Sequence, residues 1–302
     1  MHTPWGIRRR RRFSPLKRGC EVVRDGLASA GLLPALTRLS LEIDRTEVEL
    51  AFAGLPAAFD GYRILQISDP HFDALAGIAG AIRARVAGVE ADLCVFTGDY
   101  RAAEIGAFRQ RSILAPMAKI VEEVAAKDGS LAVLGNHDTQ EMVEPLEETV
   151  GVRVLTNEQV DVARDGQAIT LLGFDDPYRF YSASSRRFAA TLSSRFGTSG
   201  LESDRDEPFR IMLVHTPDLA EQAARLGCAL YLCGHTHGGQ ICLPGGRPLV
   251  QHLHKETRLG RGLWRRRQMV GYTSRGAGVA GSLPVRLFAP GEITLFRLRR
   301  GS

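Results

Sequence analysis

Cysteine is scarce in this sequence, and the cysteines form no recognisable pairs. The 302 residues include five cysteines, an odd number, and no CxxC motif. A disulfide framework would show an even number of cysteines at regular spacings. The pattern therefore argues against a disulfide-stabilised fold and favours a reducing compartment.

A long apolar segment is also absent. The segment LASAGLLPAL, residues 27–36, is too short to span a membrane and is interrupted by Gly31 and Pro34. The arginine pair before Phe13 resembles a twin-arginine export signal, but the apolar region of such a signal does not follow it. We therefore expect a cytoplasmic protein. The basic arm and the Leu-rich residues 27–39 also suggest peripheral contact with the inner face of the cell membrane.

Positive charge exceeds negative charge and is unevenly placed. The net charge is +5, and arginines form runs at residues 8–12 and 265–267. Such runs either lie on a solvated surface or contact anionic lipid headgroups or nucleic acid. No nucleic-acid-binding module is recognisable, so we do not expect nucleic acid as a partner.

Five short apolar runs end abruptly in side chains that can bind metals or transfer protons. These runs are YRILQISDPH, ADLCVFTGD, SLAVLGNHD, FRIMLVH and ALYLCGHTH. Apolar residues at three- and four-residue spacing predict helices over residues 74–89, 106–127, 140–150 and 217–226. Apolar strands that alternate with helices predict a mainly parallel sheet, which binds ligands beyond the carboxyl ends of its strands.

The remaining strand-like segments alternate between apolar and polar residues. Residues 39–52, 152–174 and 291–299 predict antiparallel strands of a second sheet packed on the first. We expect a basic N-terminal arm with a short apolar segment over residues 1–39, and one domain over residues 40–302. Within that domain, the polar residues 175–208 predict an inserted loop-helix element over the strand ends.

The polar clusters contain the ligand types of a mixed oxygen and nitrogen metal site. Asp69 and His71 are two residues apart, so on an extended strand end they lie on the same side, about 6–7 Å apart. Imidazole and carboxylate groups together suit Mn, Fe, Zn or Co better than Ca or Mg. The candidate ligands are Asp69, His71, Asp99, Asn136, His215, His235 and His237.

The order of these motifs resembles that of the calcineurin-like metallophosphoesterase superfamily. The motifs are DxH at 69–71, GD at 98–99, GNHD at 135–138, the single His215 and GHTH at 234–237. The resemblance covers about residues 60–298 and implies the family's α/β fold, a four-layer α/β/β/α sandwich of two mixed sheets flanked by helices. The segments LVHTPDLAEQAARLGCALYLCGHTHGGQICLP and GYTSRGAGVAGSLPVRLFAPGEITLFRL are similar to the bacterial branch that includes UDP-2,3-diacylglucosamine pyrophosphatases.

The resemblance also implies the role of each residue. One divalent cation would be held by Asp69, His71, Asp99 and His237, and a second by Asp99, Asn136, His215 and His235. His137 would face the substrate, and Asp138 would hold the His137 ring in place. Pro70 departs from the family pattern, in which leucine is common, but a strand end tolerates proline.

The implied activity is hydrolysis of a phosphodiester or pyrophosphate bond by two divalent metal ions (Mn, Fe, Zn or Co). The expected substrate is a phosphoester or a nucleotide-linked lipid, with UDP-2,3-diacylglucosamine of lipid A biosynthesis as the specific candidate. A nuclease is the main alternative, because the protein is basic, and a non-catalytic binding scaffold is a third.

Several residues outside these motifs are weaker candidates. Arg275 either contacts a substrate phosphate or forms a salt bridge. Arg186 and Arg187, with neighbouring aromatic residues, either meet a nucleotide or acyl chain or belong to an insert whose aromatics pin it to the body. His252 and His254 follow no apolar strand, so we expect them in a loop.

Overall fold

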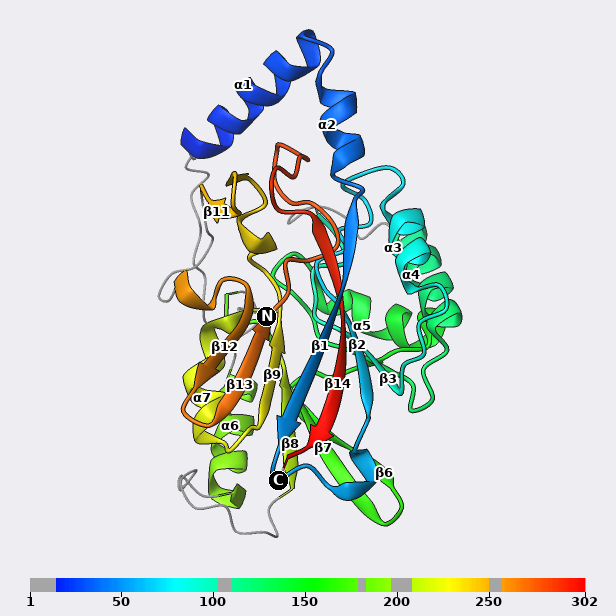
Figure 1. Cartoon of the computed structure of the whole chain (residues 1–302), viewed down its shortest axis with the longest axis vertical. Helices are drawn as coiled ribbons and strands as arrows, with labels where there is room; N and C mark the ends of the chain where they lie inside the picture. The colour runs from blue at the N-terminus through cyan, green and yellow to red at the C-terminus, as the bar shows by residue number, and fades with distance from the viewer. Residues whose placement is uncertain (1–14, 103–109, 179–182, 197–207, 250–256, 302) are drawn as a thin grey trace, which may run out of the picture.

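Two six-stranded sheets lie face to face between two layers of helices (Figure 1). The computed structural model describes residues 15–102, 110–178, 183–196, 208–249 and 257–301. Sheet A has the order β1-β14-β2-β3-β4-β5 and consists of β1 (Ile43–Phe52), β2 (Arg63–Ile67), β3 (Leu93–Phe96), β4 (Ser130–Ala132), β5 (Arg153–Val154) and β14 (Gly291–Arg300). Sheet B has the order β12-β13-β9-β8-β7-β6 and consists of β6 (Glu158–Arg164), β7 (Gln167–Gly173), β8 (Phe209–Leu213), β9 (Leu230–Cys233), β12 (Gly262–Arg266) and β13 (Met269–Thr273). A small hairpin is formed by β10 (Cys242–Leu243) and β11 (Arg247–Pro248).

Helices cover the outer face of each sheet. Sheet A is covered by α3 (Ile78–Val86), α4 (Gln110–Val124) and the short turns η2 (Gln140–Met142), α5 (Val143–Pro145) and η3 (Leu146–Val150). Sheet B is covered by α6 (Ala183–Phe196), η4 (Pro217–Leu219) and α7 (Ala220–Arg225). Further single turns are η1 (Ala57–Phe59), η5 (His237–Gly239) and η6 (Thr257–Leu259). The four-layer α/β/β/α arrangement of two mixed sheets is thereby confirmed.

The apolar runs of the sequence are continuous because both faces of their strands are covered. In β2, Ile64 points into the core between the sheets, whereas Leu65 points into the core under the helices of sheet A. Leu213 of β8 and Leu232 of β9 meet Ile64 from the opposite sheet, and all of these side chains are fully buried. Burying one such side chain contributes about 1.5–3 kcal/mol to folding.

The predicted division into one parallel and one antiparallel sheet is wrong. The alternating segments β1 and β14 lie in sheet A, where they pair with each other in parallel, and β6 and β7 form an antiparallel pair in sheet B. Alternation reports that one face of a strand is exposed, and it does not report which sheet the strand joins. The strands that precede the candidate ligands are consequently divided between the two sheets.

The predicted helices are present but shorter than their periodic patterns. The segment 74–89 contains α3, and 217–226 contains η4 and α7. The segment 140–150 is a series of 3-10, α and π turns with Pro145 among them. The segment 106–127 contains α4, and residues 106–109 lie outside the described part. In the insert, Leu192 and Phe188 of α6 pack on the outer face of sheet B.

Two N-terminal helices, α1 (Pro15–Ser29) and α2 (Leu33–Leu39), extend beyond the sheets (Figure 1). The sequence predicted an arm with a short apolar segment in this region, and the two helices were not predicted. Among the described side chains of residues 18–39, none is buried. The run of arginines at 8–12 lies outside the described residues. None of the helices described combines the length and apolar character needed to cross a bilayer.

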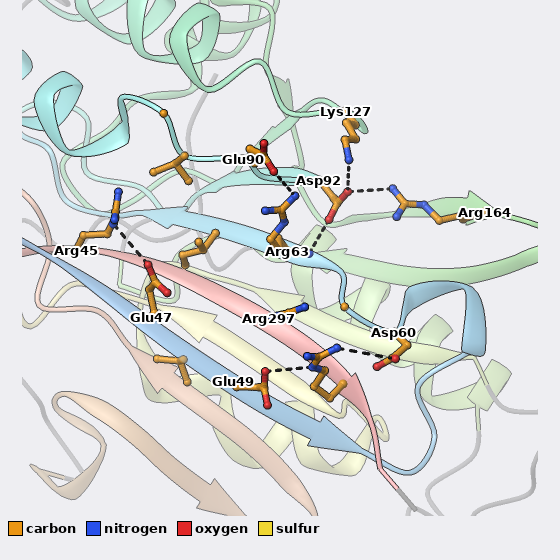
Figure 2. A pocket seen from close by; sticks show the side chains of 16 residues that line it. Arg45, Glu47, Glu49, Asp60, Arg63, Glu90, Asp92, Lys127, Arg164 and Arg297 are labelled. Atoms are coloured by element: carbon orange, nitrogen blue, oxygen red, sulfur yellow. Dashed lines mark hydrogen bonds and ion pairs between the residues drawn. The ribbon is translucent and has the colours of Figure 1, made fainter.

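A charged groove lies along β1 and β14 and beside the amino ends of β2 and β3 (Figure 2). Its cations and anions pair with one another: Arg63 Nη2 lies 2.9 Å from Glu90, and Lys127 Nζ lies 3.4 Å from Asp92. Arg164 from β6 also reaches Asp92, at 3.4 Å. Because these charges neutralise each other, the groove stabilises the packing of the two sheets and is a poor site for an anionic substrate.

Candidate metal centre

The candidate ligands follow the carboxyl ends of five strands, three in sheet A and two in sheet B. Asp69 and His71 follow β2, and Asp99 follows β3. The remaining ligands follow β4 (Asn136), β8 (His215) and β9 (His235 and His237). The structure brings six of these side chains into two adjacent groups, each of which could hold one metal ion, and a third such group combines His71 and Asp99 with His137.

The first group contains Asp69, His71 and His237. The Nε2 atoms of His71 and His237 lie 3.1 Å apart, and His237 Nε2 lies 3.4 Å from Asp69 Oδ1. All three residues are buried. The family resemblance implied this set, together with Asp99, for one cation.

The second group contains Asp99, His215 and His235. His215 Nε2 lies 3.2 Å from Asp99 Oδ2 and 3.3 Å from His235 Nδ1. Asn136 is half-buried and directly precedes His137, whose backbone N–H donates to Asp99 Oδ1 at 2.8 Å. The backbone therefore places Asn136 next to a residue that binds Asp99.

Asp99 lies between the two groups. Its Oδ2 atom is 3.2 Å from His215 Nε2 of the second group and 3.7 Å from His71 Nε2 of the first. The other oxygen accepts the His137 amide, which fixes the orientation of the carboxylate. A carboxylate in this position can bridge two cations.

The orientation of three imidazoles is fixed by main-chain carbonyls. Nδ1 of His71, His137 and His215 lies 2.7–2.8 Å from the carbonyl oxygens of Arg101, Ala102 and Thr97, respectively. If each Nδ1 carries the proton, each Nε2 presents its lone pair to the centre. Ring nitrogens that face each other at 3.1–3.3 Å need a proton or a cation between them. The residues therefore fit divalent cations of the Mn, Fe, Co or Zn type.

Burial and charge set the protonation of these groups in the metal-free protein. Burial lowers the pKa of His71 to about 4 and raises the pKa of Asp69 to about 6. Burial likewise lowers the pKa of His237, so both imidazoles of the first group stay neutral. For Asp99, burial acts to raise the pKa, but the nearby His215 and His137 outweigh it and hold the pKa well below its usual range.

The carboxylate of Asp138 binds the main chain, a role that the prediction for this residue did not include. Its carboxylate accepts the backbone N–H groups of Asp99 at 2.7 Å, Tyr100 at 2.9 Å and Gly135 at 2.7 Å. Asp138 thus fixes the turn that carries Asp99. His137 is half-buried, and its Nε2 lies 3.9 Å from Asp99 Oδ2, at the edge of the two groups.

Most of the candidate ligands have a left-handed backbone conformation, which sequence reasoning missed. The φ angles are +49° at Asp69, +40° at His71, +59° at Asp99, +75° at His235 and +51° at His237. Such positions cost a non-glycine residue about 1–3 kcal/mol each and cluster at functional sites. The available signal was the residue type, because Asp, Asn and His tolerate this region better than most residues.

Two glycines make room for the carboxylates, and sequence reasoning missed them as well. A Cβ atom at Gly234 would lie 2.2 Å from Asp69 Oδ2, and one at Gly135 would lie 2.2 Å from Asp99 Oδ1. Both directly precede a candidate ligand, as Gly98 does. The repeated pairs GD, GN and GH were the signal in the sequence.

The weaker candidates lie outside the two groups. Arg275 forms salt bridges with Glu292 at 2.5 Å and Asp44 at 3.0 Å, as the alternative interpretation expected. Arg186 and Arg187 are exposed on α6. His252 and His254 lie outside the described residues.

An aromatic ring lies against one of the candidate ligands. The ring of Tyr178 stacks on the candidate ligand His235, with centroids 5.2 Å apart.

The second arginine run, residues 265–267, is partly neutralised. Arg266 and Arg267 lie 3.8 Å and 2.8 Å from Glu221 on α7.

Sequence comparisons with known proteins cover most of the chain. Residues 62–239 match the calcineurin-like phosphoesterase family. The uncharacterized metallophosphoesterase YkuE of Bacillus subtilis (strain 168) is 28% identical over 85% of this chain and 86% of its own length. Phosphodiesterase YaeI of Escherichia coli (strain K12) is 26% identical over 78% of this chain and 82% of its own length. A transmembrane protein with metallophosphoesterase domain from Danio rerio is 27% identical over 84% of this chain and 57% of its own length.

Proposed function

Because this chain belongs to the calcineurin-like phosphoesterase family and is a metal-dependent phosphoester hydrolase, we propose that it cleaves a phosphodiester or pyrophosphate bond with two adjacent divalent cations. The observation that supports this most directly is the position of Asp99 Oδ2, 3.2 Å from His215 and 3.7 Å from His71. One carboxylate oxygen at this point is within reach of both groups, which favours a pair of ions over a single one.

The two groups define the proposed ligand sets. The first cation would be held by Asp69, His71, Asp99 and His237, and the second by Asp99, Asn136, His215 and His235. When bound, the cations would activate a water for attack on phosphorus and offset the negative charge of the phosphate oxygens.

His137 is the proposed proton donor. Its Nδ1 faces the carbonyl of Ala102 at 2.7 Å, so Nε2 is directed toward the edge of the centre. In the imidazolium form, the proton on Nε2 would pass to the leaving oxygen or stabilise charge that develops on the phosphate. We expect His137→Ala to lower kcat by about 10²–10⁴-fold. Metal content, measured by mass spectrometry, should stay at two ions per chain, and a loss of metal would instead make His137 a ligand.

Hydrolysis of a simple phosphodiester tests the reaction. Metal-free protein reloaded with Mn²⁺ should hydrolyse bis-p-nitrophenyl phosphate, and the Asp99→Asn variant should not. The substitution is nearly isosteric, so the variant should fold as the parent does, which circular dichroism can check. Turnover that is equal in the two proteins, or absent from both on a panel of phosphoesters, would contradict the proposal.

For the substrate, we propose a nucleotide-linked lipid of the UDP-2,3-diacylglucosamine type. The support is the similarity of residues 213–244 and 271–298 to the corresponding bacterial branch. Water would break the P–O–P bond, with its hydroxyl on one phosphorus and its proton on the leaving phosphate. UMP and the lipid monophosphate are the expected products, and chromatography detects them. If the protein hydrolyses the aryl diester but releases no UMP, it is a phosphodiesterase that acts on another substrate.

We also propose peripheral contact with an anionic membrane surface. Exposed apolar side chains gather on the N-terminal helices, where Val22 is 71% exposed and Val23 is 51% exposed. These helices project from one end of the molecule (Figure 1), and basic residues such as Arg18 accompany them. An apolar and basic helix suits the boundary between headgroups and acyl chains.

Vesicle binding tests this contact. The protein should sediment with vesicles that contain phosphatidylglycerol, and the double substitution Val22→Asp and Val23→Asp should weaken this binding. Leu263→Asp is the matched control, because Leu263 is 54% exposed on β12, away from the N-terminal helices. Equal binding by all three proteins would contradict the proposal.

A further inference from the structure

The buried residue Arg286 occupies an unusual position behind the first group of candidate ligands. Its side chain is 3% exposed, yet no carboxylate pairs with it among the described residues. Its Nη2 atom instead lies 3.2 Å from Nδ1 of His237. For His71 and His215, the atom that faces Nδ1 is a carbonyl oxygen. Among these three imidazoles, His237 is the one whose Nδ1 faces a guanidinium.

The guanidinium of Arg286 also binds main-chain carbonyls from three segments. An arginine has five N–H donors, and five carbonyls accept from this one. These carbonyls belong to His237, Arg275, Gly276, Gly278 and Ala289. Arg286 thereby joins the turn η5, which carries His237, to the loop at residues 274–278.

That loop in turn fixes Asp69. The N–H of Gly278 donates to the Asp69 carbonyl, and the N–H of Ala277 donates to the Ser68 carbonyl, both at 2.8 Å. Ser68 Oγ donates to Asp69 Oδ2 at 2.5 Å. A Cβ atom at Gly276 would lie 2.7 Å from Asp69 Cβ, so loop and ligand are in close contact. Two of the three ligands in the first group therefore depend on the same arginine.

We propose that Arg286 is a positioning residue that shapes one half of the metal centre, the half with Asp69, His71 and His237. It touches neither the substrate nor the cations. Its hydrogen bonds to the His237 carbonyl and to the carbonyls of residues 275–278 hold the turn that carries His237 and the loop behind Asp69 in the arrangement that receives a cation. The inference rests on the proposed two-metal function. The half with Asp99, His215 and His235 has no contact with Arg286 among the described residues, and it should not respond to changes there.

Mn²⁺ affinity in two ligand-deficient backgrounds separates the halves. In His235→Ala, the first half keeps its ligands, and Arg286→Lys should weaken Mn²⁺ binding by about 10–100-fold, the usual effect of losing an outer partner of a metal ligand. In His71→Ala, the second half keeps its ligands, and the same substitution should change binding by about twofold or less. Free Mn²⁺ in each titration is measured by electron paramagnetic resonance.

Arg210 supplies the matched control. It is 1% exposed near the start of β8, and its Nη1 donates to the Leu226 carbonyl at 3.1 Å, far along the strand from His215. Arg210→Lys should leave Mn²⁺ binding unchanged in both backgrounds, and Arg286→Lys should keep its metal-free thermal stability near that of Arg210→Lys.

The outcomes distinguish the inference from the proposed function. Wild-type protein that binds fewer than two Mn²⁺ ions would count against the function itself. Suppose that wild-type protein binds two ions, but Arg286→Lys lowers Mn²⁺ affinity equally in the His235→Ala and His71→Ala backgrounds, or in neither. That result would overturn the role of Arg286. Failure of Arg286→Lys to fold, when Arg210→Lys folds, would also overturn it, because Arg286 would then support the whole fold.

Discussion

Single residues at this centre combine a ligand side chain with a strained backbone. His71 and Asp99 have φ angles of +40° and +59°, values that glycine adopts more easily than any other residue. A histidine or aspartate at such a position lowers stability, and the surrounding hydrogen bonds maintain it. The candidate ligand positions therefore exchange stability for a fixed direction of the side chain.

Replacement of His71 by glycine and by alanine measures this strain. In metal-free protein, His71→Gly should be more stable than His71→Ala by about 1 kcal/mol, because alanine pays the left-handed penalty and glycine does not. Urea denaturation gives the two free energies of unfolding. Ser112 on helix α4 is the control, where alanine should exceed glycine by about 1 kcal/mol. If alanine were the more stable residue at position 71, the backbone strain would be absent.

Sequence motifs predicted the residues of the site better than their contacts. The seven candidate ligands follow strand ends, and six of them meet in two groups, because parallel strands bring their carboxyl ends to one edge. The role of Asp138 could not be predicted, since the sequence does not show that Asp99, Tyr100 and Gly135 would point their N–H groups at it. Arg286 was not predicted either, although it lies in the segment 271–298, because the sequence does not show which carbonyls its guanidinium reaches.

Secondary-structure elements divide into those that build the sheets and those that stand apart. The helices α3 and α7 bury apolar faces on the sheets, whereas the described side chains of α1 and α2 remain at least partly exposed. The apolar periodicity of α3 and α7 made them predictable. The N-terminal helices were not predicted, because they contribute little to a core and their described apolar side chains remain at least partly exposed.

Removal of residues 1–39 should therefore leave the domain intact. We expect the melting temperature of the shortened chain, residues 40–302, to differ from that of the full chain by less than about 4 °C, the shift that about 1 kcal/mol causes in a domain of this size. Differential scanning calorimetry provides the comparison. Vesicle binding should fall at the same time. A much larger drop in melting temperature would mean that α1 and α2 belong to the folded core.

In the molecule as a whole, the two sheets are joined by different interactions at their two ends. At one end, the candidate ligands of both sheets converge on the metal centre. At the other end, Asp92 of sheet A accepts the Arg63 amide at 2.8 Å and pairs with Arg164 of sheet B. Burial acts to raise the pKa of Asp92, but the Arg63 amide and the charges of Arg164 and Lys127 outweigh it and lower the pKa.

The pH dependence of stability tests the Asp92 cluster. Because the folded state lowers its pKa, Asp92 adds stability above its unfolded pKa of about 3.9 and loses it as pH falls below that value. Asp92→Asn should cost about 1–3 kcal/mol at about pH 7, and the difference from wild type should shrink toward about pH 3. Glu90→Gln, in an exposed pair with Arg63, should cost less than about 1 kcal/mol. A cost for Asp92→Asn that is independent of pH would exclude the charge as its cause.

The assignment of strands to sheets was the part of the fold that periodicity could not provide. β1 and β14 alternate because one face is solvated over part of their length, and yet they pair within sheet A. Only long-range pairing distinguishes the two sheets, and local patterns do not contain it. The four-layer arrangement was predictable because the ordered metal motifs resemble those of a family whose fold is known.

The most direct test of the account is the anomalous diffraction of crystals soaked with Mn²⁺. Two peaks about 3.5–4 Å apart, with the Asp99 carboxylate between them, are the predicted result. A single peak, or peaks that lie away from Asp99, would contradict the two-metal centre on which the proposed function depends.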